Sequence, residues 1–189
     1  MKRLLKLVSI LVISLNLPAN LYAKNQQKMS ATLCNQPYAL CSAAKCIPDP
    51  RQTGYAICHC EVINGISVGF TSCQKRTPVT NDDNTLRIIS TFSFENGTKS
   101  SMICPNGTLW TDCIDAPCTV NPENSKKAIC SCPIKTKSVM ITFGGHCKTS
   151  TCNTGFWSGA TPEISSFLRN TLEKALKYKP QVAKQCRQQ

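Results

Sequence analysis

The hydrophobic pattern takes three forms along the chain, and each form predicts a different kind of element. Residues 7–17 (LVSILVISLNL) are almost continuously apolar. Residues 55–143 hold short runs rich in β-branched and aromatic residues, separated by Gly, Pro, Asn and Asp, which is typical of strands and turns. From residue 162 onward, apolar side chains recur at the spacing of an α-helix. The pattern therefore predicts an apolar leader, a β-rich body and a C-terminal helix.

The apolar leader has the features of a secretory signal peptide. Three basic residues stand within its first six positions, an apolar run of about 11 residues follows, and the small residue Ala23 precedes Lys24. The run is shorter than the roughly 20 residues that span a bilayer. We expect cleavage after Ala23 and no transmembrane span after signal cleavage. An uncleaved membrane anchor is the alternative.

The body predicts a β-hairpin in each of two parts. Strand formers at 55–63 and 66–71 flank Asn64-Gly65, a dipeptide typical of two-residue hairpin turns. In the second part, residues 127–134 and 139–143 predict two strands joined by a longer turn.

The segment between the two hairpins predicts a three-stranded meander. Its strands are expected at 87–94, 99–104 and 108–111, with turns at Asn96-Gly97 and Pro105-Asn106-Gly107. The polar stretch 74–84 precedes these strands and marks the end of the first part.

The C-terminal helix is predicted by its capping signals as well as its periodicity. Thr161-Pro162-Glu163 supplies an N-cap, a proline at the first helical position and an acid in the first turn. Pro180 is expected to end the helix. A basic amphipathic helix of this kind binds membranes or a partner in some proteins. We expect this one to pack on the β-rich body, with a disulfide at each flank.

The cysteines show an internal repeat, because four of them recur at a constant offset of 72 residues. The first set is Cys41, Cys46, Cys58 and Cys60, and the second set is Cys113, Cys118, Cys130 and Cys132. The flanking cysteines complete six in each module, with Cys34 and Cys73 in the first and Cys104 and Cys147 in the second. Cys152 and Cys186 are left over. We expect three disulfides in each module and a seventh between Cys152 and Cys186.

The pairing within each module stays open, since six cysteines allow 15 connectivities. One bond is excluded by geometry. Cys58 and Cys60 stand two apart on an expected strand, so their side chains run parallel and a bond between them would strain the backbone.

These expectations define a small, disulfide-rich, mainly β fold with two homologous β-hairpin modules and a C-terminal amphipathic α-helix. The segments are a signal peptide (1–23), module 1 (24–80), a β linker or meander (81–103), module 2 (104–152) and a C-terminal loop and helix (153–189).

Composition explains why such modules need cross-links. Beyond residue 23, cysteines make up about 8% of 166 residues, near the level typical of disulfide scaffolds, and other hydrophobic residues only about 30%. Small modules with thin cores depend on such staples. The counts argue against a cytosolic globular enzyme, a polytopic membrane protein and a long disordered tail. We expect a periplasmic or secreted location.

The charge points to an anionic surface as one kind of partner. Without the leader, the chain has 19 basic and 10 acidic residues, a net charge of +9. Such an excess favours contact with anionic lipid or polysaccharide. No aromatic-basic motif accompanies it, so no nucleic-acid partner is expected.

No motif for catalysis or for a cofactor is present. The chain lacks CxxC and CxxCH, and residues 155–159 do not form GxSxG. We therefore predict no catalytic, cofactor or metal residues.

Two alternatives depend on the histidines. His59 and His146, each beside a cysteine, would form a sulfur–imidazole metal site if free thiolates were present. A cleft joining His146 to Asp112 or Asp115 would instead favour an enzyme of unfamiliar type.

Three segments carry a resemblance. TLWTDCIDAPCTV, ITFGGHC and TCNTGFWSGAT resemble uncharacterised cysteine-rich exported bacterial proteins of this length. The resemblance implies export and brings no known activity, so no functional residue is carried over.

The expected function is that of an exported, disulfide-stabilised binding protein whose partner is a protein or an envelope polymer. Rigid disulfide loops make preorganised binders, so a secreted hydrolase inhibitor is one alternative. A cationic membrane-associating protein that binds through Arg169, Lys174 and Lys177 is another.

Reduction is expected to unfold the protein. A disulfide typically contributes about 2–4 kcal/mol, and several of them together exceed a usual folding margin of about 5–15 kcal/mol. Near-UV circular dichroism of reduced and oxidised samples measures this loss of tertiary structure. A reduced sample that keeps its near-UV spectrum would contradict the prediction.

Overall fold

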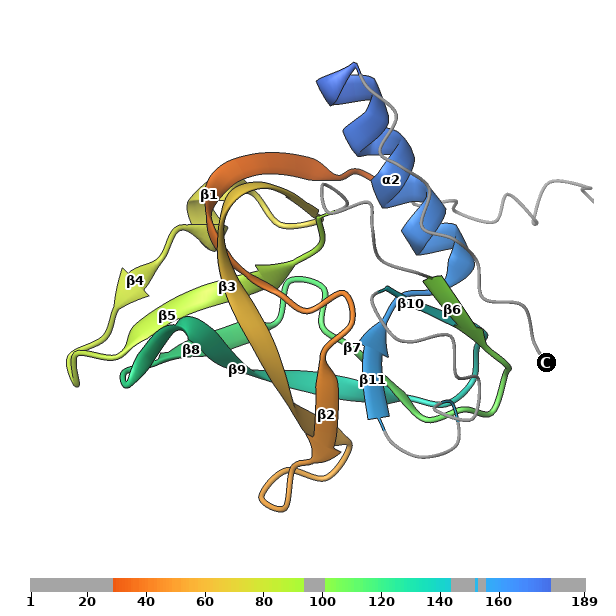
Figure 1. Ribbon diagram of the computed structural model, residues 1–189, viewed down its shortest axis with the longest axis horizontal. Helices are drawn as coiled ribbons and strands as arrows, with labels where there is room; N and C mark the ends of the chain where they lie inside the picture. The colour runs from red at the N-terminus through yellow and green to blue at the C-terminus, as the bar shows by residue number, and fades with distance from the viewer. Residues whose placement is uncertain (1–28, 94–100, 144–151, 153–155, 178–189) are drawn as a thin grey trace, which may run out of the picture.

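The computed structural model describes residues 29–93, 101–143, 152 and 156–177, and it is mainly β (Figure 1). The elements in this part of the chain are β1 (Thr32–Leu40), β2 (Lys45–Pro48), β3 (Tyr55–Gly69), α1 (Cys73–Arg76), β4 (Val79–Thr80), β5 (Leu86–Thr91), β6 (Ser101–Cys104), β7 (Trp110–Asp112), β8 (Pro117–Asn121), β9 (Asn124–Lys135), β10 (Met140–Phe143), β11 (Phe156–Gly159) and α2 (Pro162–Leu176). We call residues 29–93 the first half and residues 101–177 the second half.

Nine strands form one sheet that closes into two rings, and the β3–β9 pair belongs to both rings. One ring follows the order β3-β2-β11-β7-β9, and the other follows β9-β8-β5-β1-β3. The short strand β4 extends the sheet beyond β5. Strands β6 and β10 form a separate two-stranded sheet. Ring closure leaves few free edges among the described strands.

Each half contributes a strand to the other half's side of the sheet. β5 pairs antiparallel with β8 of the second half and parallel with β1. In the same way, β11 pairs antiparallel with β2 of the first half and parallel with β7. The halves are therefore interleaved rather than placed side by side.

The β3–β9 ladder lies at the centre of this arrangement. It runs from Tyr55 opposite Pro133 to Glu61 opposite Lys127, with Cys58 opposite Cys130 between them. Cys58 and Cys130 are 72 residues apart, which is the offset of the cysteine repeat, and the ladder is symmetric about this pair. The repeat offset converts the pair Tyr55–Pro133 at one end of the ladder into the pair Lys127–Glu61 at the other end.

Six disulfides link the described residues, three within each half. They are Cys34–Cys73, Cys41–Cys60, Cys46–Cys58, Cys104–Cys152, Cys113–Cys132 and Cys118–Cys130. The two bonds formed by the repeated cysteines have the same sequence separations, 19 and 12 residues, in both halves.

One predicted disulfide is wrong. Cys152 bonds to Cys104, at the end of β6, and not to Cys186. The bond joins two segments 48 residues apart in the chain, a proximity that only the folded arrangement creates. Cys147 and Cys186 lie outside the described residues.

The predicted hairpin at Asn64-Gly65 is also wrong. β3 continues straight through these two residues, which lie opposite Pro37 and Gln36 of β1. Neither residue has the positive φ that a two-residue hairpin turn of this type requires. A nine-position ladder with β1 replaces the local turn.

The two strands expected in the second part exist, but they do not pair with each other as a hairpin. β10 pairs with β6 and not with β9, and β5, β6 and β7 do not form a meander. The turn at 105–107 is confirmed, since Thr108 N donates to the Pro105 carbonyl over 3.3 Å and Gly107 has φ +94°. The turn expected at Asn96-Gly97 lies outside the described residues.

The predicted C-terminal helix is confirmed. In α2, Ile164 N donates to Thr161 Oγ1 over 3.3 Å, and Pro162 occupies the first turn. The helix ends at Leu176, before Pro180. Leu168 and Leu172 are fully buried, together with strand residues of the body. The apolar face of α2 therefore packs on the body. Among the described residues, no helix is long and apolar enough to cross a membrane.

Cutting the backbone between the halves is expected to leave them associated. All six cysteines of the first half are paired within it, so no disulfide crosses residues 94–100. The ladders β3–β9, β5–β8 and β2–β11 hold the halves together without covalent bonds.

A protease site inserted at residues 96–97 tests this expectation. The cut fragments should co-elute in native buffer and separate in denaturant without reductant. Separate elution in native buffer would show that the halves are independent domains.

Candidate binding face

Four disulfides occupy the inward side of β2, β3, β9 and β8. Cys46, Cys58, Cys130 and Cys118 form one row across these four strands. All four are at most 3% exposed. Such a row holds the four strands in a fixed register.

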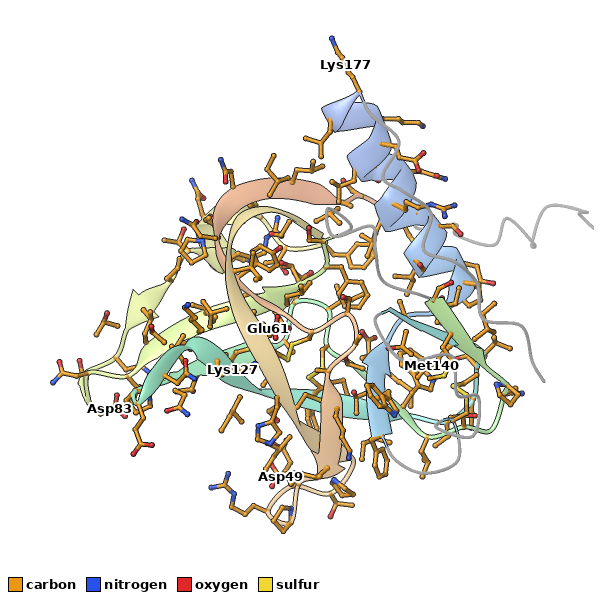
Figure 2. The ribbon with its side chains drawn as sticks, in the orientation of Figure 1. Asp49, Glu61, Asp83, Lys127, Met140 and Lys177 are labelled. Carbon is orange, nitrogen blue, oxygen red and sulfur yellow. A yellow bond between two sulfur atoms is a disulfide. The ribbon has the colours of Figure 1, made fainter. Side chains whose placement is uncertain are left out.

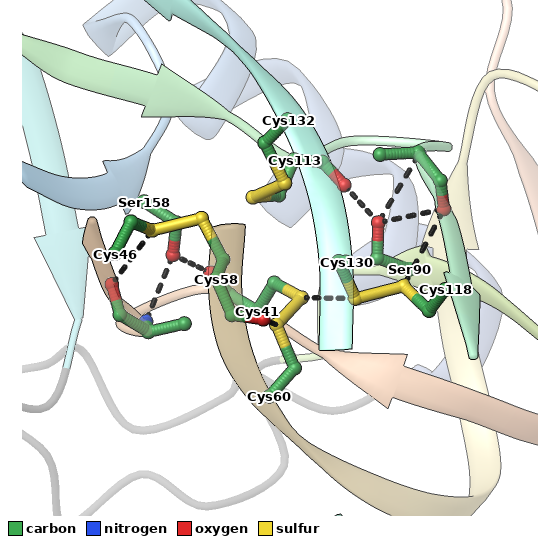
Figure 3. The surroundings of a disulfide bond; sticks show 12 residues. Cys41, Cys46, Cys58, Cys60, Ser90, Cys113, Cys118, Cys130, Cys132 and Ser158 are labelled. Carbon is green, nitrogen blue, oxygen red and sulfur yellow. Dashed lines mark hydrogen bonds between the residues drawn. A yellow bond between two sulfur atoms is a disulfide. The ribbon is translucent and has the colours of Figure 1, made fainter. Parts of the chain in front are cut away.

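The sulfur atoms of the two halves are in contact. Cys41 Sγ lies 3.4 Å from Cys130 Sγ, which belongs to a disulfide of the other half (Figure 3). The sulfurs of Cys41, Cys118 and Cys130 lie within 4.8 Å of one another, and so do those of Cys46, Cys58 and Cys113. Each ring of the sheet therefore encloses disulfides from both halves.

The described geometry does not support a metal site at these sulfurs. All of them are in disulfides, and metals bind the thiolate form of cysteine. His59 alternates with Cys58 and Cys60 along β3, so it faces the opposite side of the sheet and is exposed. His146 lies outside the described residues.

Asp115 has a structural role. Its Oδ2 accepts hydrogen bonds from Phe70 N over 2.6 Å and Thr71 N over 2.9 Å. It also lies near Arg76, a buried residue that donates to the Thr32 carbonyl over 2.7 Å. Burial lowers the pKa of Arg76, while the charge of Asp115 raises it. These contacts tie the β7–β8 turn to the first half.

Asp112 is the other acid that the sequence offered for catalysis. Its Oδ1 accepts a hydrogen bond from Ile114 N over 3.3 Å. Burial raises the pKa of Asp112, and the hydrogen bond from Ile114 N offsets only part of this rise. His59, the one histidine among the described residues, points outward from the sheet, and His146 lies outside these residues. The enzyme alternative gains no support from this geometry.

The outward side of the same four strands is apolar at its centre. We call it the outer face and define it by Ile47, Ile57, His59, Thr119, Ile129 and Ser131, whose side chains alternate with the buried row. Ile47 is 52% exposed and Ile129 is 46% exposed, although both are large hydrophobic residues. Helix α2 lies at the other end of the molecule (Figure 1).

Strand register fixes the positions of these side chains. Ile47, Ile57 and Ser131 are neighbours across β2, β3 and β9. In the next row, Arg87 of β5 lies opposite Thr119, and Ile129 lies between Thr119 and His59. The pair Glu61–Lys127 bounds the face, with Lys127 Nζ 3.2 Å from Glu61 Oε1 (Figure 2).

A groove of about 280 Å³ opens on the outer face. Ile57 and Ile129 line it together with Thr119 and Ser131, and Arg51 and Arg87 contribute charge. We call it the arginine groove. An apolar lining with a few polar groups is typical of binding sites.

The turn that carries Arg51 is well anchored. Asp49 N donates to the Tyr55 carbonyl over 2.9 Å, and Ile134 N of β9 donates to the Gly54 carbonyl over 2.8 Å. Gly54 has φ +82°, a conformation that favours glycine. Asp49 Oδ1 accepts from Arg51 N over 2.8 Å and lies 3.7 Å from Arg51 Nε. The turn therefore holds the base of the Arg51 side chain at the groove.

The alternation of residue types in two segments of the sequence is a signal for this face. In Ala56-Ile57-Cys58-His59-Cys60 and its counterpart at 128–132, every second residue is Ala or Cys. If these small residues and disulfides face inward, the isoleucine between them must face outward. The two segments thus predict Ile57 and Ile129 on the outward side of the sheet.

Comparisons with known proteins supply no relative whose function would transfer. No family model, curated protein or solved structure matches the chain. Many disulfides fit an oxidising extracellular or periplasmic environment. Beyond that, the case for function depends on the geometry described above.

Asp112→Asn is expected to stabilise the protein at neutral pH. Because burial raises the folded-state pKa of Asp112, the folded protein loses stability as pH rises through that pKa. Asparagine removes this loss and keeps an acceptor for Ile114 N. The variant should gain up to about 1 kcal/mol at pH 7, and the difference should vanish below the ordinary aspartate pKa of about 3.9.

Asp83→Asn is the control of opposite sign. Hydrogen bonds from Thr85 lower the pKa of Asp83, so its carboxylate stabilises the fold above the ordinary pKa and that variant should be less stable at pH 7. Urea unfolding at pH 7 and pH 3 measures both changes. An Asp112→Asn variant that is less stable than wild type at pH 7 would contradict the assignment.

Proposed function

We propose that this protein is an exported, disulfide-stabilised binding protein and that the outer face is its binding surface. The supporting observation is that exposed isoleucines occupy the most heavily cross-linked part of the sheet. An exposed apolar patch on a small protein marks an interaction site in many cases. A surface held rigid by buried disulfides loses little conformational entropy on binding, which favours affinity.

The composition of the face favours a protein as partner. Its centre is apolar, with Ile47, Ile57 and Ile129, and its margins carry charged residues such as Glu61 and Lys127. An apolar centre with a polar rim is the usual organisation of a protein–protein interface. Inhibition of a secreted hydrolase would be one form of such binding, and an envelope polymer would be the other class of partner.

We also propose that the two halves are copies of one unit. Their repeated cysteines form bonds of equal sequence separation, and the β3–β9 ladder is symmetric about Cys58 and Cys130. In this interpretation, the inward cysteines and alanines serve the shared fold. The outward residues, which differ between the halves at most positions, serve the binding surface.

The membrane-associating alternative has less support. An amphipathic helix binds a membrane through its apolar face. In α2 that face includes Leu168 and Leu172, both fully buried against the body. Membrane binding through α2 would require the helix to leave this site.

Capture experiments with matched variants test the outer face. Oxidised wild-type protein is immobilised and exposed to material from its native surroundings, in parallel with Ile129→Asp and Met29→Asp. Met29 precedes β1 at the end where Thr32 pairs with Gly69, away from the outer face, and it is 47% exposed, close to the 46% of Ile129, so it controls for the added charge. Capture of a partner that uses the outer face should fall by about tenfold or more with Ile129→Asp and should not change with the control variant.

Equal capture by the two variants would contradict the proposal. Near-UV circular dichroism of each variant, recorded under oxidising conditions, checks that both keep the native fold.

A further inference from the structure

We infer that the arginine groove binds an acidic polypeptide segment, in which carboxylates flank an apolar side chain. This inference depends on the proposed function and names the chemistry of the partner. It follows from three features of the groove, namely its charge, its apolar floor and its difference from the equivalent region of the other half.

The charge of the groove is carried by two arginines. Arg51 and Arg87 come from different parts of the chain, the β2–β3 turn and β5, and both are exposed. The one acid in the lining, Asp49, has a side chain only 7% exposed and is already engaged by Arg51. Arg87 forms no ion pair with the described residues. The groove therefore offers cationic groups to a ligand.

Guanidinium groups bind carboxylates well because their planar, forked donors match the two oxygens. In the same lining, Ile57 and Ile129 offer apolar surface, and Thr119 and Ser131 offer hydroxyl groups. A groove of about 280 Å³ has room for a side chain. An apolar residue with neighbouring Asp or Glu side chains satisfies both parts of the lining.

The other half shows that this charge is not imposed by the fold. The β8–β9 turn repeats the hydrogen bond of the β2–β3 turn, since Glu123 N donates to Asn121 Oδ1 over 2.9 Å as Arg51 N donates to Asp49 Oδ1 over 2.8 Å. At this equivalent position the side chain is an acid, Glu123, instead of the base Arg51. The equivalent turn of the second half therefore carries an acid where the arginine groove has a base.

A second copy of the chain and a lipid surface fit less well. A copy of this chain brings the same excess of basic residues, which repels it at long range. A lipid surface presents headgroup charge over a broad plane, whereas here the apolar residues and the arginines line one groove. An acidic polypeptide supplies both charge and a side chain that enters the groove.

Titration of ¹⁵N-labelled, oxidised full-length mature protein tests the inference. The probes are an acetylated, amidated hexapeptide of alternating leucine and glutamate and its leucine–glutamine analogue. The acidic peptide is expected to shift the amide signals of Ile57, Thr119 and Ile129 and to bind more weakly as salt rises. The glutamine analogue is expected to bind at least roughly threefold more weakly.

Charge-neutral variants locate the effect. Arg51→Gln and Arg87→Gln should each weaken binding of the acidic peptide by roughly three- to tenfold. Lys75→Gln removes one charge from an exposed position on α1 and should leave binding unchanged.

The remaining outcomes separate this inference from the proposed function. Equal binding of both peptides at the outer face would overturn the acidic preference and leave the face as a binding surface. Binding of phosphatidylglycerol vesicles without binding of either peptide would overturn it in favour of lipid. Arginine-dependent peptide binding, together with equal capture by Ile129→Asp and Met29→Asp, would support the groove and contradict the wider outer-face proposal.

Discussion

The contact between disulfides of the two halves is the constraint on which the rest of this structure depends. Cys58 and Cys130 stand opposite each other in the β3–β9 ladder, and each also bonds to the next strand outward. Few large aliphatic side chains accompany these cysteines in the surrounding core, which is otherwise rich in alanine. Small side chains bury little apolar area. Covalent bonds therefore provide much of the stability that a larger core would supply.

This use of sulfur has a consequence for the opposite side of the sheet. Because the inward row is fixed by covalent bonds, the outward positions are free to differ without loss of the fold. Ile57 and Ile129 are the same in both halves, but His59 corresponds to Ser131 and Arg51 to Glu123. A rigid surface with variable side chains is the property that a binding protein needs.

Interleaving adds a second source of rigidity. Ser90 of β5 donates a hydrogen bond to the Cys113 carbonyl, and Ser158 of β11 donates one to the Cys41 carbonyl. A serine of each half therefore holds the backbone at a cysteine of the other half. Both serines are fully buried. The turns that begin at Cys41 and Cys113 are thus fixed by residues 117 and 23 positions away in the chain.

Local signals predicted the local features of the fold, and long-range pairing explains the errors. The N-cap and proline of α2 act within one turn of helix, so Thr161 and Pro162 marked its start correctly. Asn64-Gly65 failed as a turn signal because β1, more than twenty residues earlier, supplies the partner strand. The bond between Cys104 and Cys152 depends on contacts that cysteine spacing does not encode. Of the candidate binding face, only the outward isoleucines could be predicted from their alternation with cysteine, while the groove also depends on the register of β5 against β8.

Disulfide mapping of the native, unreduced protein by partial reduction, alkylation and mass spectrometry tests the central claim most directly. The account predicts Cys41–Cys60 with Cys113–Cys132 and Cys46–Cys58 with Cys118–Cys130, all within their own halves. A bond between the halves, such as one joining Cys41 to Cys130, or free thiols among these eight cysteines, would contradict it.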